Sequence, residues 1–158
     1  MSPHSDGFSR KAKGKITFTL VQDGKIIDEI VRHNLVVNKG YDLVSKWASG
    51  ENFETDRLIY IATGTGGHVE GHTELPVPPS VDDTALETEI SRKPILEFSN
   101  PSTNISRFRT TFIPSESVGT VTECGLFSFS GQLFARATFA GIVKTSGFNL
   151  IVNWDVAF

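Results

Sequence analysis

Cysteine and methionine each occur once in the chain, and the cysteine is Cys124. A single cysteine excludes an intrachain disulfide framework and a metal site built from several thiolates. No apolar run approaches the roughly 18 residues that a transmembrane helix needs. The polar segment from Met1 to Gly14 also has no apolar signal-peptide core. We therefore expect a protein that folds in a cytoplasm and has no membrane partner.

A strong excess of one charge sign is missing as well. The formal net charge is -3, which argues against a surface that binds polyanions, so we expect no nucleic-acid partner. At 158 residues the chain has room for one domain with a substantial core, and its 12 phenylalanines and two tryptophans supply bulky core groups.

The most regular pattern lies at the end of the chain. Every second residue there is apolar: Phe148, Leu150, Val152, Trp154, Val156 and Phe158. The residues between them are mostly polar or small, and successive side chains of a strand point to opposite faces. This alternation predicts a long strand with one apolar face that needs a second layer to cover it, and a C-terminus tied into that strand.

Similar but shorter alternations predict further strands. The expected strands are 15–21, 25–31, 34–37, 57–63, 88–98, 104–113, 120–129, 132–139 and 148–158. Turns are expected at Asp23-Gly24, 99–103 and 114–119. The segment 38–50 has apolar residues at helical spacing, with Asn38 as the expected N-cap and Gly50 as the expected end. The pattern predicts a mainly β protein, an antiparallel β-sandwich of about 8–10 strands with one short α-helix near residues 38–50.

Two segments fall outside this regular pattern. Residues 1–14 are predicted to form an extended arm, which is either disordered or ordered on a neighbouring subunit; Arg10, Lys11 and Lys13 make it basic. Residues 15–158 then form a single domain that carries a long loop at 64–80. Long loops in compact domains often contact partners, so the candidate interaction residues are Arg10, Lys11, Lys13, His68, Glu70 and His72.

The loop 64–80 also holds the best candidates for a metal site. His68 and His72, with Glu70 and Glu74 among them, have side chains that can bind zinc or another divalent ion. The surrounding glycines disfavour the helix that would place both imidazoles on one face. The loop lacks the glycine spacing and the Gly-Lys-Ser/Thr of nucleotide-binding loops. We therefore expect no metal site and no cofactor, with His68 and His72 as weak metal candidates.

Other polar residues have structural explanations. Asp82 and Asp83 follow Ser80 and are explained by capping of a short helical turn through residues 84–86. The paired carboxylates Asp82/Asp83 and Glu87/Glu89 are also the residue type that glycosidases use, but we favour capping and the helix dipole as the explanation.

Cys124 has no thiol-protease motif around it and is expected to be buried and inert. Glu123 is either a solvent-facing residue or an ion-pair partner of Arg107, Arg109 or Arg136. Trp47 and Trp154 occupy core positions, and His33 is expected to be structural. The sequence thus predicts no catalytic residues and no enzyme.

The order of several segments resembles a known class of proteins. These segments are 34–40 (NLVVNKG) before the helix, 59–66 (IYIATGTG), 82–90 (DDTALETEI), 110–112 (TTF), 119–127 (GTVTECGLF), 133–137 (LFARA) and 150–158 (LIVNWDVAF). Over residues 30–158 the chain resembles small virion structural proteins of tailed bacteriophages, found in tail, neck, baseplate or fibre-attachment assemblies. The arm and the loop 64–80 depart from that class. The resemblance implies a β-sandwich without catalytic residues, located in the virion after assembly in the host cytoplasm.

Three hypotheses follow for the function. The first is a non-enzymatic virion subunit that forms a homo-oligomer and joins neck, tail or fibre components. The alternative is a carbohydrate-binding module that recognises host surface glycans, which requires exposed aromatic side chains. The third is a metal-dependent hydrolase that uses His68, His72, Glu70 or Glu74.

Overall fold

The computed structural model describes residues 11–51 and 55–158. Nine of the strands form one antiparallel sheet, and two short strands form a separate hairpin. In chain order the elements are β1 (Lys13–Gln22), β2 (Lys25–Val36), α1 (Asn38–Ala48), β3 (Leu58–Gly64), β4 (His68–Val69), β5 (His72–Pro76), β6 (Glu89–Pro94), β7 (Glu97–Ser102), β8 (Ile105–Phe112), β9 (Gly119–Ser128), β10 (Leu133–Lys144) and β11 (Asn149–Ala157).

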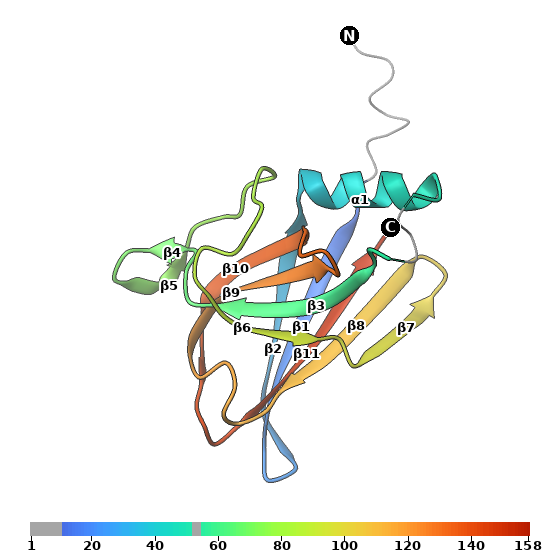
Figure 1. Ribbon diagram of the computed structural model, residues 1–158. Helices are drawn as coiled ribbons and strands as arrows, with labels where there is room; N and C mark the ends of the chain where they lie inside the picture. The colour runs from blue at the N-terminus through green and yellow to red at the C-terminus, as the bar shows by residue number, and fades with distance from the viewer. Residues whose placement is uncertain (1–10, 52–54) are drawn as a thin grey trace.

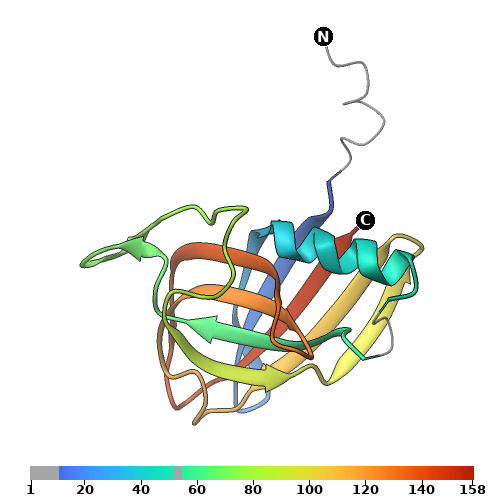
Figure 2. The ribbon, with the colours of Figure 1, turned by 45° about the horizontal axis from the view of Figure 1, so that its top comes forward.

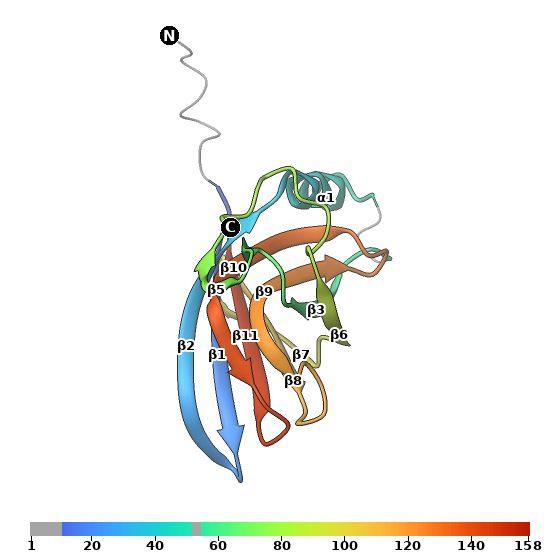
Figure 3. The same ribbon diagram turned by 90° about the vertical axis from the view of Figure 1, so that its left-hand side faces the viewer.

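The nine strands curl into two facing layers because two segments change partners along their length (Figures 1 and 3). β2 pairs with β1 as far as Asn34 and then with β10 through Leu35 and Val36. β6 pairs with β3 while β7, a few residues later, pairs with β8. One layer is therefore β2-β1-β11-β8-β7 and the other is β10-β9-β3-β6. The predicted antiparallel β-sandwich class is confirmed.

The C-terminal strand lies in the middle of its layer, between β1 and β8. Its apolar side chains Leu150, Val152, Trp154 and Val156 are buried, and the residues between them are half-buried. The predicted alternation is thus confirmed for β11, whereas the predicted end residues lie outside the strand: Phe148 is half-buried and Phe158 is exposed. Opposite layers meet in the core, where the rings of Phe18 and Phe139 lie 5.0 Å apart between centroids.

The helix lies across one end of the sandwich (Figure 2). Gly40 and Leu43 are the buried residues of this helix. Gly40 packs so close to β10 that a Cβ there would lie 2.2 Å from the Phe134 carbonyl oxygen. The prediction of Asn38 as the N-cap is wrong, because Val37 occupies that position. The Asn38 side-chain amide donates a hydrogen bond to Asp82 instead. Gly50 adopts the expected left-handed conformation after the helix, with φ of 81°.

Other predicted boundaries need correction. β1 begins at Lys13, inside the range predicted as an arm, and Arg10 lies outside the described residues. The hairpin turn at Asp23-Gly24 is confirmed, since both residues have positive φ. The predicted turn at 99–103 is wrong because β7 runs to Ser102 and pairs with β8. The loop 64–80 is not wholly irregular, because it contains the β4–β5 hairpin.

Candidate functional site

A fully buried carboxylate anchors the glycine-rich segment before β4. Glu123 on β9 has no exposed surface. Its Oε2 accepts hydrogen bonds from the backbone N–H of Gly66 and Thr88, both at 2.8 Å, and its Oε1 accepts one from the N–H of Glu87 at 2.9 Å. Backbone amides that converge on an anion are the device of phosphate-binding loops. Here the anion is the protein's own carboxylate.

Arg136 completes this buried network from the neighbouring strand β10. Its Nη2 donates to Glu123 Oε1 at 2.9 Å, and its Nη1 donates to Asp83 Oδ2 at 2.8 Å. The sequence leaves Arg107, Arg109 and Arg136 as possible ion-pair partners of Glu123. In the structure the partner is Arg136. Arg107, in contrast, pairs with Asp155 on β11. We call Glu123, Arg136 and Asp83 the buried ion network.

The segment around Ser80 has the predicted capping contacts without the predicted helix. Asp83 Oδ2 accepts the Ser80 N–H at 2.9 Å, and Ser80 Oγ accepts the Asp82 N–H at 3.2 Å. No helical turn follows at residues 84–86, so that prediction is wrong. The reason is that Asp83 also binds Arg136 and Leu86 is buried, which fixes the chain as a strap over β9 and β10.

The buried ion network holds the base of a hairpin that extends from the body of the sandwich (Figures 1 and 2). The Val77 N–H donates to the Gly67 carbonyl at 2.8 Å, and Thr138 Oγ1 on β10 donates to the Val77 carbonyl at 2.8 Å. The side chains of this segment face solvent, including the apolar Val69, Leu75 and Val77. An anchored backbone with exposed apolar side chains is suited to contact another protein.

The two histidines predicted as weak metal candidates have separate partners on this hairpin. The His68 ring nitrogens face the backbone carbonyls of Val69 at 2.8 Å and Thr65 at 2.9 Å. The hydrogen bond to Val69, reinforced by the one to Thr65, raises the pKa of His68 because only the protonated ring donates from both nitrogens.

His72 Nδ1 lies 2.9 Å from Glu74 Oε1, and Glu70 is exposed at the turn. Within residues 11–51 and 55–158, no three His, Cys, Asp or Glu side chains are arranged to hold a metal ion.

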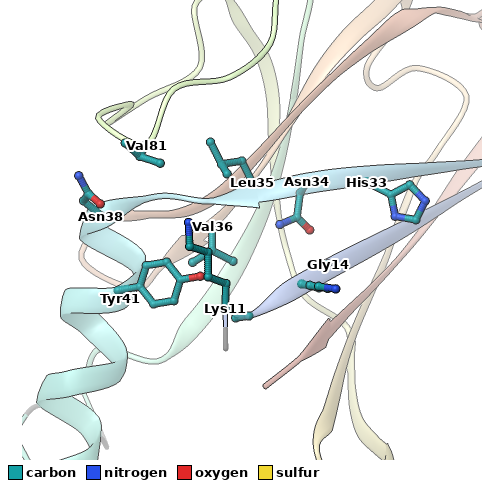
Figure 4. A pocket seen from close by; sticks show the side chains of 11 residues that line it. Lys11, Gly14, His33, Asn34, Leu35, Val36, Asn38, Tyr41 and Val81 are labelled. Atoms are coloured by element: carbon teal, nitrogen blue, oxygen red, sulfur yellow. The ribbon is translucent and has the colours of Figure 1, made fainter. Parts of the chain in front are cut away.

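A second site lies where the chain enters the sandwich (Figure 4). A groove of about 710 Å³ is bounded by the start of β1, the end of β2 and the first turn of α1. Lys11, Lys13 and His33 line it, and no carboxylate of the described residues does. The groove is thus suited to acidic or acceptor-rich groups. Two of the predicted interaction residues, Lys11 and Lys13, lie here, far from His68 in sequence.

Asn34 links this groove to the core. Its Oδ1 accepts a 2.8 Å hydrogen bond from Trp154 Nε1, which satisfies the one polar atom of the largest core side chain. A Cβ on Gly14 would lie 1.5 Å from Asn34 Oδ1, so glycine is required for the amide to cross β1. His33 is exposed on β2 next to it.

An aromatic cleft of about 370 Å³ lies at the same end of the sandwich as α1. Trp47, Phe98, Phe108 and Phe158 line it together with Arg57. Trp47 Nε1 donates to the Asp56 carbonyl, which fixes the orientation of the indole. The core prediction is confirmed for Trp154, while Trp47 is half-buried against the core and borders this cleft.

The remaining candidates, Cys124, Glu87 and Glu89, each have contacts of their own. Cys124 is buried, and burial raises the pKa of its thiol. Glu89 pairs with Arg92 on the surface, while Glu87 donates its backbone N–H to Glu123 and accepts the N–H of Gly67 on its side chain.

Comparison with known proteins adds no assignment. No family model matches the chain, and neither does any curated protein or solved structure. The helix in the described part of the chain is too short and too polar to cross a membrane.

Proposed function

We propose that the chain is a non-enzymatic structural subunit of a tailed-phage virion, which self-associates and connects neck, tail or fibre components. The observation that carries the proposal is the β4–β5 hairpin, whose base is tied to a buried carboxylate while its apolar side chains face solvent. A hairpin built in this way keeps its shape when it meets a partner, which lowers the entropic cost of binding.

The order of segments that resembles small tailed-phage virion proteins supports the same proposal. The basic groove at Lys11 and Lys13, which also borders Val81 of the strap, supplies a second contact region suited to an acidic segment of a neighbouring subunit. A subunit of this kind is assembled in the host cytoplasm and ends in the virion. Its partners are copies of itself and other virion structural proteins.

The test is assembly of the purified protein with virion proteins encoded by neighbouring genes. Sedimentation and negative-stain microscopy are expected to show a closed oligomer, and pull-down is expected to retain at least one virion protein. Val69→Asp and Leu75→Asp on the hairpin are expected to weaken the pull-down, whereas Ile113→Asp, exposed elsewhere, serves as the control. A strict monomer that retains no virion protein would contradict the proposal.

The aromatic cleft gives the carbohydrate-binding alternative a specific location. Phe98, which is 52% exposed, Phe158, which is 39% exposed, and the half-buried Trp47 are aromatic side chains of this cleft that could stack against a sugar ring. If this alternative holds, a glycan array gives hits that Phe98→Ala removes, and sugar shifts the Trp47 fluorescence. A blank array and unchanged fluorescence would contradict the carbohydrate-binding alternative and leave the virion proposal as the remaining one.

A further inference from the structure

One edge of the layer β2-β1-β11-β8-β7 is long and has no neighbouring strand in the described part of the chain. From Lys25 to His33, β2 pairs with β1 on one side, and no strand in the described part of the chain pairs with its other side (Figure 3). This stretch spans about 30 Å. It contains neither proline nor glycine, and Ile26, Ile27 and Val31 are exposed on it. An edge of this kind is a template for another strand.

The opposite edge of the same layer is protected. β7 is six residues long, contains Pro101 and pairs irregularly with β8 between Ser99 and Ser102. Proline and a short, irregular strand are the usual means of blocking an edge. Of these two edges, β2 is therefore the better suited to pair with another strand, and a head-to-tail chain that joins β2 to β7 is disfavoured.

The backbone groups that would bind this partner are identified by their present contacts. The Glu29 N–H donates to Asp28 Oδ1, and the Val31 carbonyl accepts from Arg32 Nη1, both at 2.8 Å. Because alternate residues of a strand turn their backbone groups to the same side, Glu29 and Val31 present theirs away from β1. In the single chain, the neighbouring side chains Asp28 and Arg32 occupy them.

We propose that a second copy of this chain adds to this edge, with the two β2 strands antiparallel about a two-fold axis at Ile30. The axis is perpendicular to the sheet, so residues that face each other lie on the same side of it. Glu29 then exchanges backbone hydrogen bonds with Val31 of the second copy. Asp28 faces Arg32 of the second copy, and by symmetry each such contact occurs twice.

Charge selects this register over its neighbours. An axis at Glu29 places that carboxylate opposite itself, which is unfavourable. An axis at Val31 places Arg32 opposite Ile30 and Asp28 opposite Asn34, so no Asp–Arg pair forms. With the axis at Ile30, Asp28 and Arg32 of each strand each gain an opposite charge at a pair of closely spaced side chains. The edge is therefore self-complementary. This inference rests on the proposed self-association and names the surface that mediates it.

The test is a charge swap followed by sedimentation velocity over a range of protein concentrations. Asp28→Arg alone and Arg32→Asp alone place like charges opposite each other, and each is expected to weaken dimerisation by about tenfold or more. The double variant D28R/R32D restores opposite charges and is expected to dimerise within about threefold of the unchanged protein. Glu97→Arg on β7 makes the same charge change at the other edge and is the matched control.

The outcomes separate this inference from the proposed function. An oligomer that is insensitive to both single swaps overturns pairing through β2 and leaves the virion proposal standing. Single swaps that dissociate the dimer without rescue in the double variant also overturn it. A protein that is a monomer at every concentration overturns the self-association itself. Both residues lie on the surface edge, and circular dichroism with thermal melting verifies that each variant folds.

Discussion

Arg136 Nη2 lies 2.9 Å from Glu123 Oε1, with the Glu123 side chain fully buried and the Arg136 side chain 10% exposed. The carboxylate also accepts three backbone N–H groups, one from Gly66 before β4 and two from Glu87 and Thr88 before β6. A buried carboxylate with all of these partners holds the surrounding backbone in one arrangement. Any donor that lost its hydrogen bond to Glu123 would stay buried, with no water to replace the carboxylate. The exposed hairpin therefore has a rigid base.

Replacement of Glu123 by glutamine is expected to lower the free energy of unfolding by about 3 kcal/mol, because Arg136 loses a buried partner and the Gln amide faces backbone donors. Urea denaturation measures the change, and hydrogen exchange at Gly66 and Thr88 is expected to accelerate. Glu89→Gln is the control, since its pair with Arg92 is half-exposed and is worth less than about 1 kcal/mol. Equal losses in the two variants would contradict a special role for Glu123.

Gly66→Ala is expected to destabilise the protein by about 2 kcal/mol through overpacking. A Cβ there would lie 2.6 Å from both Glu123 Oε2 and the Glu87 Cβ. Gly71→Ala is the matched control: nothing lies within 4 Å of its Cβ position, and its cost of about 1 kcal/mol comes only from a positive φ of 77°. In a double-mutant cycle, Gly66→Ala and Glu123→Gln are expected to be non-additive, whereas Gly71→Ala and Glu123→Gln add.

The hairpin is expected to be more stable in mildly acidic solution. Hydrogen bonds to the Val69 and Thr65 carbonyls raise the pKa of His68 above its unfolded value of about 6.5. The stabilisation by the charged ring is thus complete below that unfolded value and is lost as the pH rises through the raised folded pKa. An NMR titration of the His68 ring and hydrogen exchange of the hairpin against pH measure both. His68→Gln is expected to abolish this dependence; its persistence would assign the effect to another group.

The Cys124 thiol is expected to be unreactive in the folded protein. Burial raises its pKa, so almost no thiolate forms near neutral pH, and reagents cannot reach the sulfur. A thiol-specific chromogenic reagent is expected to label one equivalent only after denaturant is added. Rapid labelling under native conditions would show that β9 opens locally.

Sequence patterns predicted the strands well where burial alternates along one face. β1, β8 and β11 have that alternation, and the structure has each of them within a few residues of the predicted bounds. The β4–β5 hairpin was not predicted, because all residues of β5 are exposed and no apolar alternation marks it. The helical turn predicted at residues 84–86 is absent although its capping contacts are present. The reason is that Asp83 also binds Arg136 on β10 as part of the buried ion network.

The partner of Glu123 shows the limit of pattern reading most clearly. Glu123 lies opposite Thr138, and Arg136 lies opposite Gly125, so the two charges are diagonal neighbours across the β9–β10 hairpin. The alternation of apolar and polar residues could limit the possible partners of Glu123 to the arginines of β8 and β10. Which arginine reaches the carboxylate depends on the pairing register of β9 and β10. The irregular pairing near Thr138 is not visible in the sequence.

The sequence alone determined that this protein is a β-sandwich with one short helix and a C-terminal core strand, because two-residue periodicity and helical spacing are local properties of the chain. Only the tertiary structure decided that the glycine-rich segment holds a carboxylate of the protein, that the arm's lysines border a groove, and that β2 has an exposed edge. Those features depend on which strands become neighbours, and that choice is made by the packing of the whole chain.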